Sequence, residues 1–228
     1  LRAFLEVGEP PVYLGWGSMV AGTSEQISRF AVEAAMGAGV RAVVLGGWAA
    51  LSLDSLPVGP LREYAAANVL FYAGSLAHEW LFPRCAAAVH HGGAGTVAAV
   101  LRCGIPNIVT PVFIDQFYWA RRVQALRVGV GFSEPLRSIG APALAAAIKE
   151  CLTSPEIKAT AKTLGKQLKD ERPGAETAAD VVAEVARQRM LALAAAARTE
   201  DLRPPTAASL KSGHAIGKGA SFGSHVCV

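Results

Sequence analysis

The residues with the clearest chemical meaning form a glycine loop between a strand-like and a helix-like segment. The small apolar run Cys85–Val89 leads into His90-His91-Gly92-Gly93-Ala94-Gly95-Thr96, and a helical pattern follows over Val97–Cys103, before Gly104 and Pro106. A strand, a glycine loop and a helix N-terminus in this order present unpaired backbone N–H groups and the positive end of the helix dipole to an anion. We therefore expect a phosphate or diphosphate here, with further donors from the Thr96 hydroxyl and the His91 imidazole.

The two adjacent histidines of this loop are expected to have different roles. Neighbouring residues on a strand point to opposite faces, so at most one of His90 and His91 faces the anion. Neither pairs with cysteine or carboxylate at a spacing typical of zinc ligands, so no metal site is expected.

A second glycine-containing turn, Gly15-Trp16-Gly17-Ser18, follows the apolar segment that begins at Val12. Its backbone N–H groups and the Ser18 hydroxyl can reach the far phosphate of a nucleotide; the alternative is a tight turn without a ligand. A dinucleotide fingerprint is not met, because position 20 is Val20 instead of glycine and no acidic residue ends the next strand. The P-loop pattern GxxxxGK does not occur either, so the sequence gives no motif support for NAD or ATP as the ligand.

Two further positions leave a functional and a structural interpretation open. Asp115-Gln116 opens a helical segment, where Asp115 either caps the helix or, together with Gln116, accepts and donates hydrogen bonds to hydroxyl groups of a ligand. Trp48 follows Gly46-Gly47 at the end of a strand-like run, where its ring either faces a base or packs under the sheet.

These motifs together resemble the donor-sugar signature of the GT-B glycosyltransferases that use UDP-sugars. The resemblance is strongest to the sterol 3-beta-glucosyltransferases and to bacterial relatives that glycosylate antibiotics. It extends from about Pro10 to about Val185, with the motifs in the expected order. The matching segments are HHGGAGT, Gly104-Ile105-Pro106, Pro111, Asp115-Gln116, Val12–Met19 and His78–Arg84.

The resemblance assigns roles to individual residues. It implies that His91 contacts the diphosphate, that His90 is structural, and that Asp115 and Gln116 hold hexose hydroxyls. The diphosphate site would then comprise Ser18, His91, Gly93, Ala94, Gly95 and Thr96, and the uridine site Trp48, Leu76, Ala77 and His78.

The implied reaction is inverting transfer of a hexose from UDP-glucose, or from another UDP-hexose, to a hydroxyl of a sterol or similar lipid. The resemblance implies no cofactor and no essential metal ion. It places the general base in an N-terminal acceptor domain that this chain lacks, so the isolated chain is expected to bind the donor without transferring sugar. Two alternatives stay open: another GT-B enzyme, such as a lipid-linked sugar transferase or a sugar-nucleotide 2-epimerase, and a non-catalytic nucleotide-sugar-binding module.

Composition supports a globular protein and argues against nucleic acid as a partner. The 228 residues are 52% hydrophobic and 18% charged, and the formal net charge of +4 is spread along the chain. No apolar run approaches the about 18–20 residues of a membrane span, and no signal-peptide pattern opens the chain. A first residue of Leu indicates an interior piece of a longer protein. We expect a cytoplasmic protein, with peripheral membrane association of the full-length form left open.

Strand-like and helical patterns alternate, which predicts a Rossmann-like, doubly wound parallel sheet over residues 1–198 and a disordered tail over 199–228. The last predicted helix, Ala175–Ala197, is expected to expose Val181, Val182, Val185, Met190 and Leu191. Strands are predicted at Val12–Gly15, Arg41–Leu45, Val69–Ala73, Ala86–Val89, Asn107–Thr110 and Val128–Phe132, and the other helices at Ser24–Met36, Val97–Cys103, Asp115–Leu126, Ala141–Leu152 and Pro155–Asp170.

Overall fold

The structure is a computed structural model that describes the backbone of residues 1–201. The chain divides into two units, Leu1–Glu171 and Arg172–Val228.

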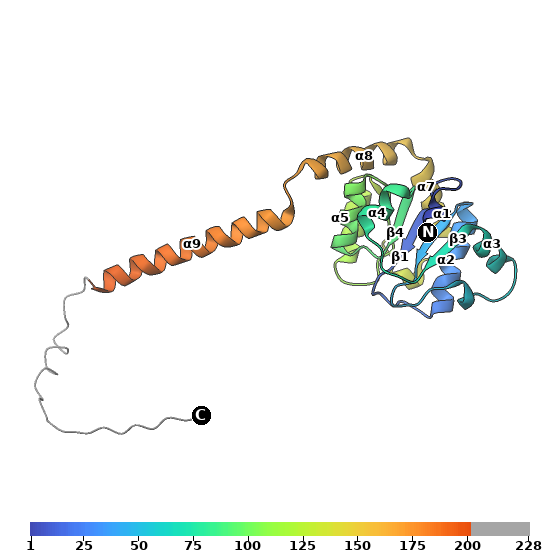
Figure 1. The fold of residues 1–228 in the computed structure, drawn as a ribbon, viewed down its shortest axis with the longest axis horizontal. Coiled ribbons are helices and arrows are strands. Elements are labelled where there is room, and N and C mark those ends of the chain that lie inside the picture. Colours follow the sequence, from blue (N-terminus) through green and yellow to red (C-terminus); the bar gives the residue numbers. More distant parts are fainter. Residues whose placement is uncertain (202–228) are drawn as a thin grey trace, which may run out of the picture. The chain divides into compact units, whose positions relative to one another are not determined.

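The first unit is built on a six-stranded parallel sheet, as the alternating pattern predicted (Figure 1). Its strand order is β3-β2-β1-β4-β5-β6. The strands after β1 are added on one side of it up to β3, and from β4 onward they are added on its other side. This order makes the fold doubly wound. The strands are β1 (Val12–Gly15), β2 (Ala42–Leu45), β3 (Val69–Tyr72), β4 (Ala87–His90), β5 (Asn107–Val109) and β6 (Gly129–Gly131).

Helices cover both faces of the sheet and pack through separate apolar clusters. One cluster joins α2, α3 and α7 to the sheet, and the other two join α1, α4, α5, α6 and much of α8 to the opposite face. The helices are α1 (Arg2–Leu5), α2 (Ser24–Ala38), α3 (Pro60–Asn68), α4 (His78–Leu81), α5 (Ala94–Cys103), α6 (Gln116–Ala125), α7 (Ala141–Thr153) and α8 (Pro155–Asp170), with short 3-10 turns at Leu53–Ser55, Phe82–Arg84 and Leu136–Ser138.

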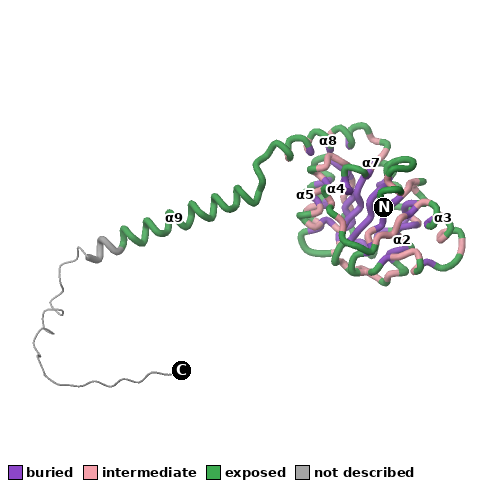
Figure 2. The backbone as a smooth tube through the Cα atoms, viewed as in Figure 1, coloured by how far each residue is buried: buried purple, intermediate pink, exposed green. Residues whose placement is uncertain are grey.

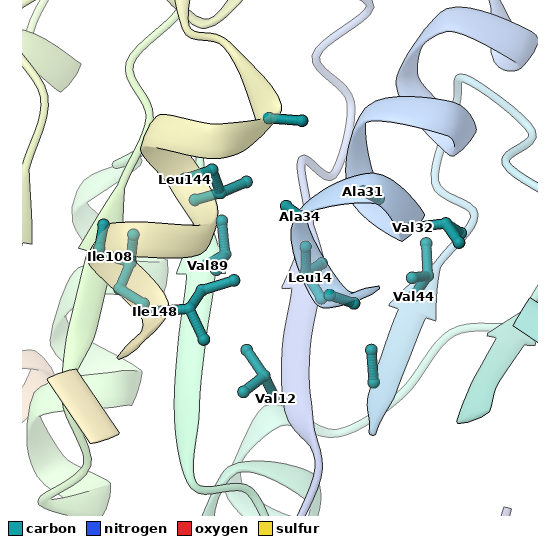
Figure 3. Close-up of a cluster of buried hydrophobic side chains, with 14 of the residues drawn as sticks. Val12, Leu14, Ala31, Val32, Ala34, Val44, Val89, Ile108, Leu144 and Ile148 are labelled. Atoms are coloured by element: carbon teal, nitrogen blue, oxygen red, sulfur yellow. The ribbon is translucent and has the colours of Figure 1, made fainter. Parts of the chain in front are cut away.

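The strands bury side chains on both faces, which is why they read as continuous apolar runs in the sequence. In β1, Val12 and Leu14 join the cluster under α2 and α7, whereas Tyr13 joins the cluster on the opposite face. Figure 3 shows Leu144 and Ile148 of α7 meeting strand side chains beside α2. The sheet is therefore held rigidly between two helical layers, and its carboxyl edge is a fixed frame for loops.

Several helix bounds differ from the predicted ones. Helix α2 starts at Ser24 as predicted, because Thr23 and Gln26 form a capping box, but it runs past Gly37 to Ala38, with Gly39 as its C-cap. Helix α5 begins at Ala94, three residues before the predicted start at Val97. Helices α1 and α3 were not predicted from the sequence.

The described part of the second unit is a single long helix, α9 (Gly174–Asp201). Its apolar side chains Val181, Val182, Val185, Met190 and Leu191 are exposed, as predicted (Figure 2). The helix continues three residues into the predicted tail 199–228, and residues 202–228 of that tail lie outside the described residues.

Within residues 1–201, no helix combines the length and the hydropathy that a membrane span requires.

Helices α5 and α8 cross at two glycines, and this contact generates a test of the packing. A methyl group on Gly165 would lie 2.6 Å from Cα of Gly104 and 2.7 Å from the Leu101 carbonyl oxygen. We predict that Gly165→Ala lowers the free energy of unfolding by about 1–3 kcal/mol in urea denaturation, because the backbones must separate. Helix propensity alone predicts that this substitution raises the free energy of unfolding, because alanine is favoured over glycine within a helix.

Gly95 of α5 is the matched control, because a methyl group there meets nothing within 4 Å. Gly95→Ala is expected to raise stability by up to about 1 kcal/mol. A stabilising Gly165→Ala would contradict the close crossing.

Candidate functional site

The predicted ligand-binding loops converge where the sheet changes winding direction. Strands β1 and β4 are neighbours, with Gly15 paired to His90 at their carboxyl ends. The chain leaves β1 toward α2 on one face and leaves β4 toward α5 on the other. Loops that separate in this way bind ligands outside the carboxyl ends of the strands in open α/β sheets.

The glycine loop after β4 has a backbone that only glycine fits. Gly92 has φ +92°, and a methyl group there would lie 2.6 Å from Cγ1 of Val109. A methyl group on Gly93 would lie 2.5 Å from Nε2 of His91. The turn therefore folds tightly over β5 and beneath the His91 ring.

The N-terminus of α5 is open to an anion. Gly93 occupies the N-cap position and supplies no side-chain cap, and no acidic residue lies in the first turn. Ala94 and Gly95 are exposed and Thr96 is half-buried. The first-turn N–H groups and the positive end of the helix dipole thus face outward. The cap residue offers these N–H groups no side-chain acceptor.

His90 is a structural residue, as the resemblance implied. Its ring is fully buried, with Nε2 3.0 Å from Oδ1 of Asn107 and Nδ1 accepting a 3.1 Å hydrogen bond from the Gly92 N–H. These partners assign the proton to Nε2. Burial lowers the pKa of His90 to about 4, so the ring is neutral at pH 7. A neutral acceptor at Nδ1 is what holds the Gly92 N–H in place.

His91 lies on the other side of the loop and has an unsatisfied nitrogen. Its Nδ1 is buried and has no hydrogen-bond partner among the described residues. The ring also lies beside Gly17, where a methyl group would come within 3.6 Å of Cε1. Burial lowers the pKa of His91, an effect that Asp115 opposes and His78 reinforces. A buried polar atom without a partner is rare in folded proteins, so this nitrogen is a candidate contact for a ligand.

The loop after β1 is braced from two sides. The buried Trp16 indole donates a 2.9 Å hydrogen bond to Oγ1 of Thr110, next to the end of β5. The Trp48 N–H donates to the Gly17 carbonyl at 3.0 Å, which ties the loop after β2 to the same turn. Ser18 is left exposed beside Gly17. Ser18 and His91 are thus brought to one edge by a network that the sequence did not reveal.

Asp115 does not act as a helix cap. It occupies the N-cap position of α6 but makes no side-chain cap hydrogen bond, and its carboxylate accepts a 3.2 Å hydrogen bond from the Trp119 indole instead. It is exposed, and it raises the pKa of His91 electrostatically. The capping interpretation of Asp115 is therefore wrong, and the carboxylate remains available at the edge of the site.

Gln116 has half of its amide committed to the loop that precedes it. Its Oε1 accepts hydrogen bonds from the backbone of Val112 at 2.7 Å and Phe113 at 3.2 Å, and its Nε2 lies 3.6 Å from the Met19 sulfur. Sulfur is a weak acceptor, so Nε2 keeps capacity to donate to a ligand. Of the predicted roles for Gln116, donation is compatible with this geometry and acceptance at Oε1 is not.

The predicted uridine residues are only partly gathered. His78 stacks on Phe82 with ring centroids 4.6 Å apart, and burial lowers the pKa of His78. Leu76 packs on the nearby apolar cluster, and Ala77 is exposed at the start of α4. Trp48 is 79% exposed, so the alternative that it packs under the sheet is wrong.

No group of three or more His, Cys, Asp or Glu side chains suited to a metal ion occurs in the part of the chain that the structure describes.

Ile114 is a strained residue that the sequence did not flag. It has φ +55° and is the β-branched member of three non-glycine residues with positive φ among those described; the others are Ala50 and Arg127. Its side chain is 77% exposed, directly before Asp115. Left-handed backbone at such a residue costs about 1–3 kcal/mol and is common at functional sites.

We predict that Ile114→Gly raises the free energy of unfolding by about 1 kcal/mol, because the relieved strain exceeds the backbone entropy that glycine loses. Urea denaturation measures the change. Ile114→Val is the matched control and should be nearly neutral, since it keeps the branched β-carbon. Equal effects of the two substitutions would contradict the assignment of strain to this backbone.

Comparison with known proteins identifies the family of this chain. Residues 68–186 match the family model described as "Erythromycin biosynthesis protein CIII-like, C-terminal domain". The chain is 38% identical over 164 residues to a sterol 3-beta-glucosyltransferase of Komagataella phaffii, covering 72% of this chain and 13% of the relative. It is also 38% identical over 172 residues to a sterol 3-beta-glucosyltransferase of Arabidopsis thaliana, covering 75% of this chain and 25% of the relative.

Solved structures show the same fold. A glycosyltransferase of kitacinnamycin superposes with a TM-score of 0.60 at 23% identity, covering 78% of this chain and 43% of that one. A UDP-glucose:anthocyanidin 3-O-glucosyltransferase in complex with UDP superposes with a TM-score of 0.62 at 20% identity, covering 75% and 38%. The chain spans a quarter or less of the two sterol glucosyltransferases and less than half of each superposed structure. It belongs to the erythromycin biosynthesis protein CIII-like C-terminal domain family of GT-B glycosyltransferases.

Proposed function

We propose that this chain binds a UDP-sugar and serves as the donor half of a UDP-dependent glycosyltransferase. The observation that carries the proposal is the buried, unpartnered Nδ1 of His91 beside the uncapped N-terminus of α5. A diphosphate supplies acceptor oxygens for both. The relatives named for sterol glucosylation support the same class of donor.

The diphosphate is neutralised in this proposal by dipoles and hydrogen bonds. The N–H groups of Gly93, Ala94 and Gly95 and the Thr96 hydroxyl donate to one phosphate, and His91 donates from Nδ1. Ser18, exposed beside Gly17, donates to the other phosphate. Donors that are already oriented before the reaction stabilise the charge that develops on the leaving UDP, without reorganisation at the moment of transfer. No essential metal ion is required by this arrangement.

In this proposal the sugar and the base lie on different loops beside the diphosphate. Asp115 accepts hydrogen bonds from hexose hydroxyls, and Gln116 donates from Nε2, the half of its amide that the loop leaves free. The uracil lies toward Leu76, Ala77 and His78. Trp48 supplies an aromatic face to the base, consistent with its exposure at this edge.

The proposed reaction is inverting transfer of glucose from UDP-glucose to a hydroxyl of a sterol or similar lipid. Direct displacement at the anomeric carbon breaks its bond to the diphosphate oxygen and forms a bond to the acceptor oxygen. A general base in an acceptor domain outside residues 1–228 takes the hydroxyl proton. The alternative, a non-catalytic module, predicts donor binding without turnover even when that domain is present.

Calorimetric titration of the chain with UDP, in EDTA, tests the diphosphate site. We predict that His91→Ala and Thr96→Ala each weaken UDP binding by roughly 5–30-fold, the equivalent of about 1–2 kcal/mol for a lost hydrogen bond to an anion. Thr163→Ala, an exposed threonine on α8, is the matched control and should bind UDP as the unmodified chain does. Absence of UDP binding by the folded chain, or equal losses in the control, would overturn the site.

A further inference from the structure

A groove between helices α5 and α8 lies outside the donor site. It encloses about 500 Å³ and is lined by residues of both helices, among them Arg102, Lys162, Lys166 and Lys169. The groove exists because the two helices meet at Gly104 and Gly165, whose backbones nearly touch. The longer side chains then rise on either side of this contact.

The groove is strongly cationic. Arg102, Lys162, Lys166 and Lys169 are all exposed, and none makes a hydrogen bond or ion pair through its side chain in the part of the chain described. No acidic residue is among the described residues that line the groove. Arg127, which is also exposed, is by contrast paired with Glu156 at 2.6 Å. Four cations without an ion pair around one groove favour an anionic occupant.

The cations are arranged as a row along α8. Lys158, Lys162, Lys166 and Lys169 follow spacings of four, four and three residues, so they share one face of the helix. The row is about 16 Å long at the rise of an α-helix. One phosphate cannot engage charges spread over that length, whereas the headgroups at a bilayer surface can.

We propose that the groove between α5 and α8, with the lysine row beside it, docks this chain on the anionic surface of a lipid bilayer. The phosphate and carboxylate groups of acidic phospholipids meet the row, and long lysine side chains reach them from the helix surface. The choice of a membrane rests on the proposed lipid acceptor, because such an acceptor is reached at the bilayer surface. The surface is separate from the residues assigned to the donor.

Sedimentation with lipid vesicles tests the proposal. The chain is expected to bind vesicles of phosphatidylcholine mixed with phosphatidylserine, to bind pure phosphatidylcholine weakly, and to dissociate as salt is raised. Each cation at an acidic surface contributes roughly a fivefold factor, so Lys162→Glu with Lys166→Glu should weaken binding by at least about 30-fold.

The matched control, Arg137→Glu with Lys149→Glu, makes the same change of charge on exposed residues at the 3-10 turn before α7 and on α7 itself. This control should retain vesicle binding. An equal loss in both variants would overturn the proposal in favour of a diffuse charge effect. Binding abolished by inorganic phosphate, but not by sodium chloride at the same ionic strength, would overturn it in favour of a small-anion site.

Titration of both variants with UDP separates this proposal from the donor site. Each variant should bind UDP as the unmodified chain does, which also shows that it is folded. Loss of vesicle binding with UDP binding intact supports the docking surface. Vesicle binding that persists in the α8 variant overturns it and leaves the donor site untouched.

Discussion

The site depends on a neutral imidazole that is never expected to touch the ligand. His90 links β5 to the glycine loop, because its ring is hydrogen-bonded to Asn107 on one side and accepts a hydrogen bond from the Gly92 N–H on the other. Burial keeps its pKa near 4, so the acceptor nitrogen stays free of a proton at pH 7. Protonation would replace that acceptor by a donor facing a donor. The turn, and with it the direction of α5, is thus set by a residue in the core.

His91, next in the chain, uses the same side-chain chemistry in the opposite way. It lies against Gly17 and leaves a buried nitrogen without a partner among the described residues. Asp115, directly after the positive-φ residue Ile114, lies near enough to influence His91, and its carboxylate makes no cap hydrogen bond. A rigid sheet, a satisfied histidine and an unsatisfied one therefore combine into a surface prepared for a diphosphate. The basic groove at α8 adds a second anionic contact away from that edge.

The sequence was sufficient for the sheet and for the location of the glycine loop, because apolar strand runs and glycine punctuation are local signals. It placed the end of α2 wrongly at Met36, since the glycine that stops the helix is Gly39 and Gly37 is tolerated within it. The commitment of Gln116 to the backbone of its own loop was not predictable, because the contact depends on a turn of unusual geometry. Positive φ at Ile114 also escaped prediction, since branched residues rarely adopt it.

Nitrogen NMR of the chain labelled with 15N-histidine tests the central claim most directly. The two ring nitrogens of each histidine report protonation and hydrogen bonding separately. On addition of UDP, the account predicts that the His91 resonances shift with occupancy, whereas His90 stays neutral and protonated at Nε2 throughout. UDP binding that leaves His91 unchanged, or that alters the tautomer of His90, would contradict the division of labour between the two histidines.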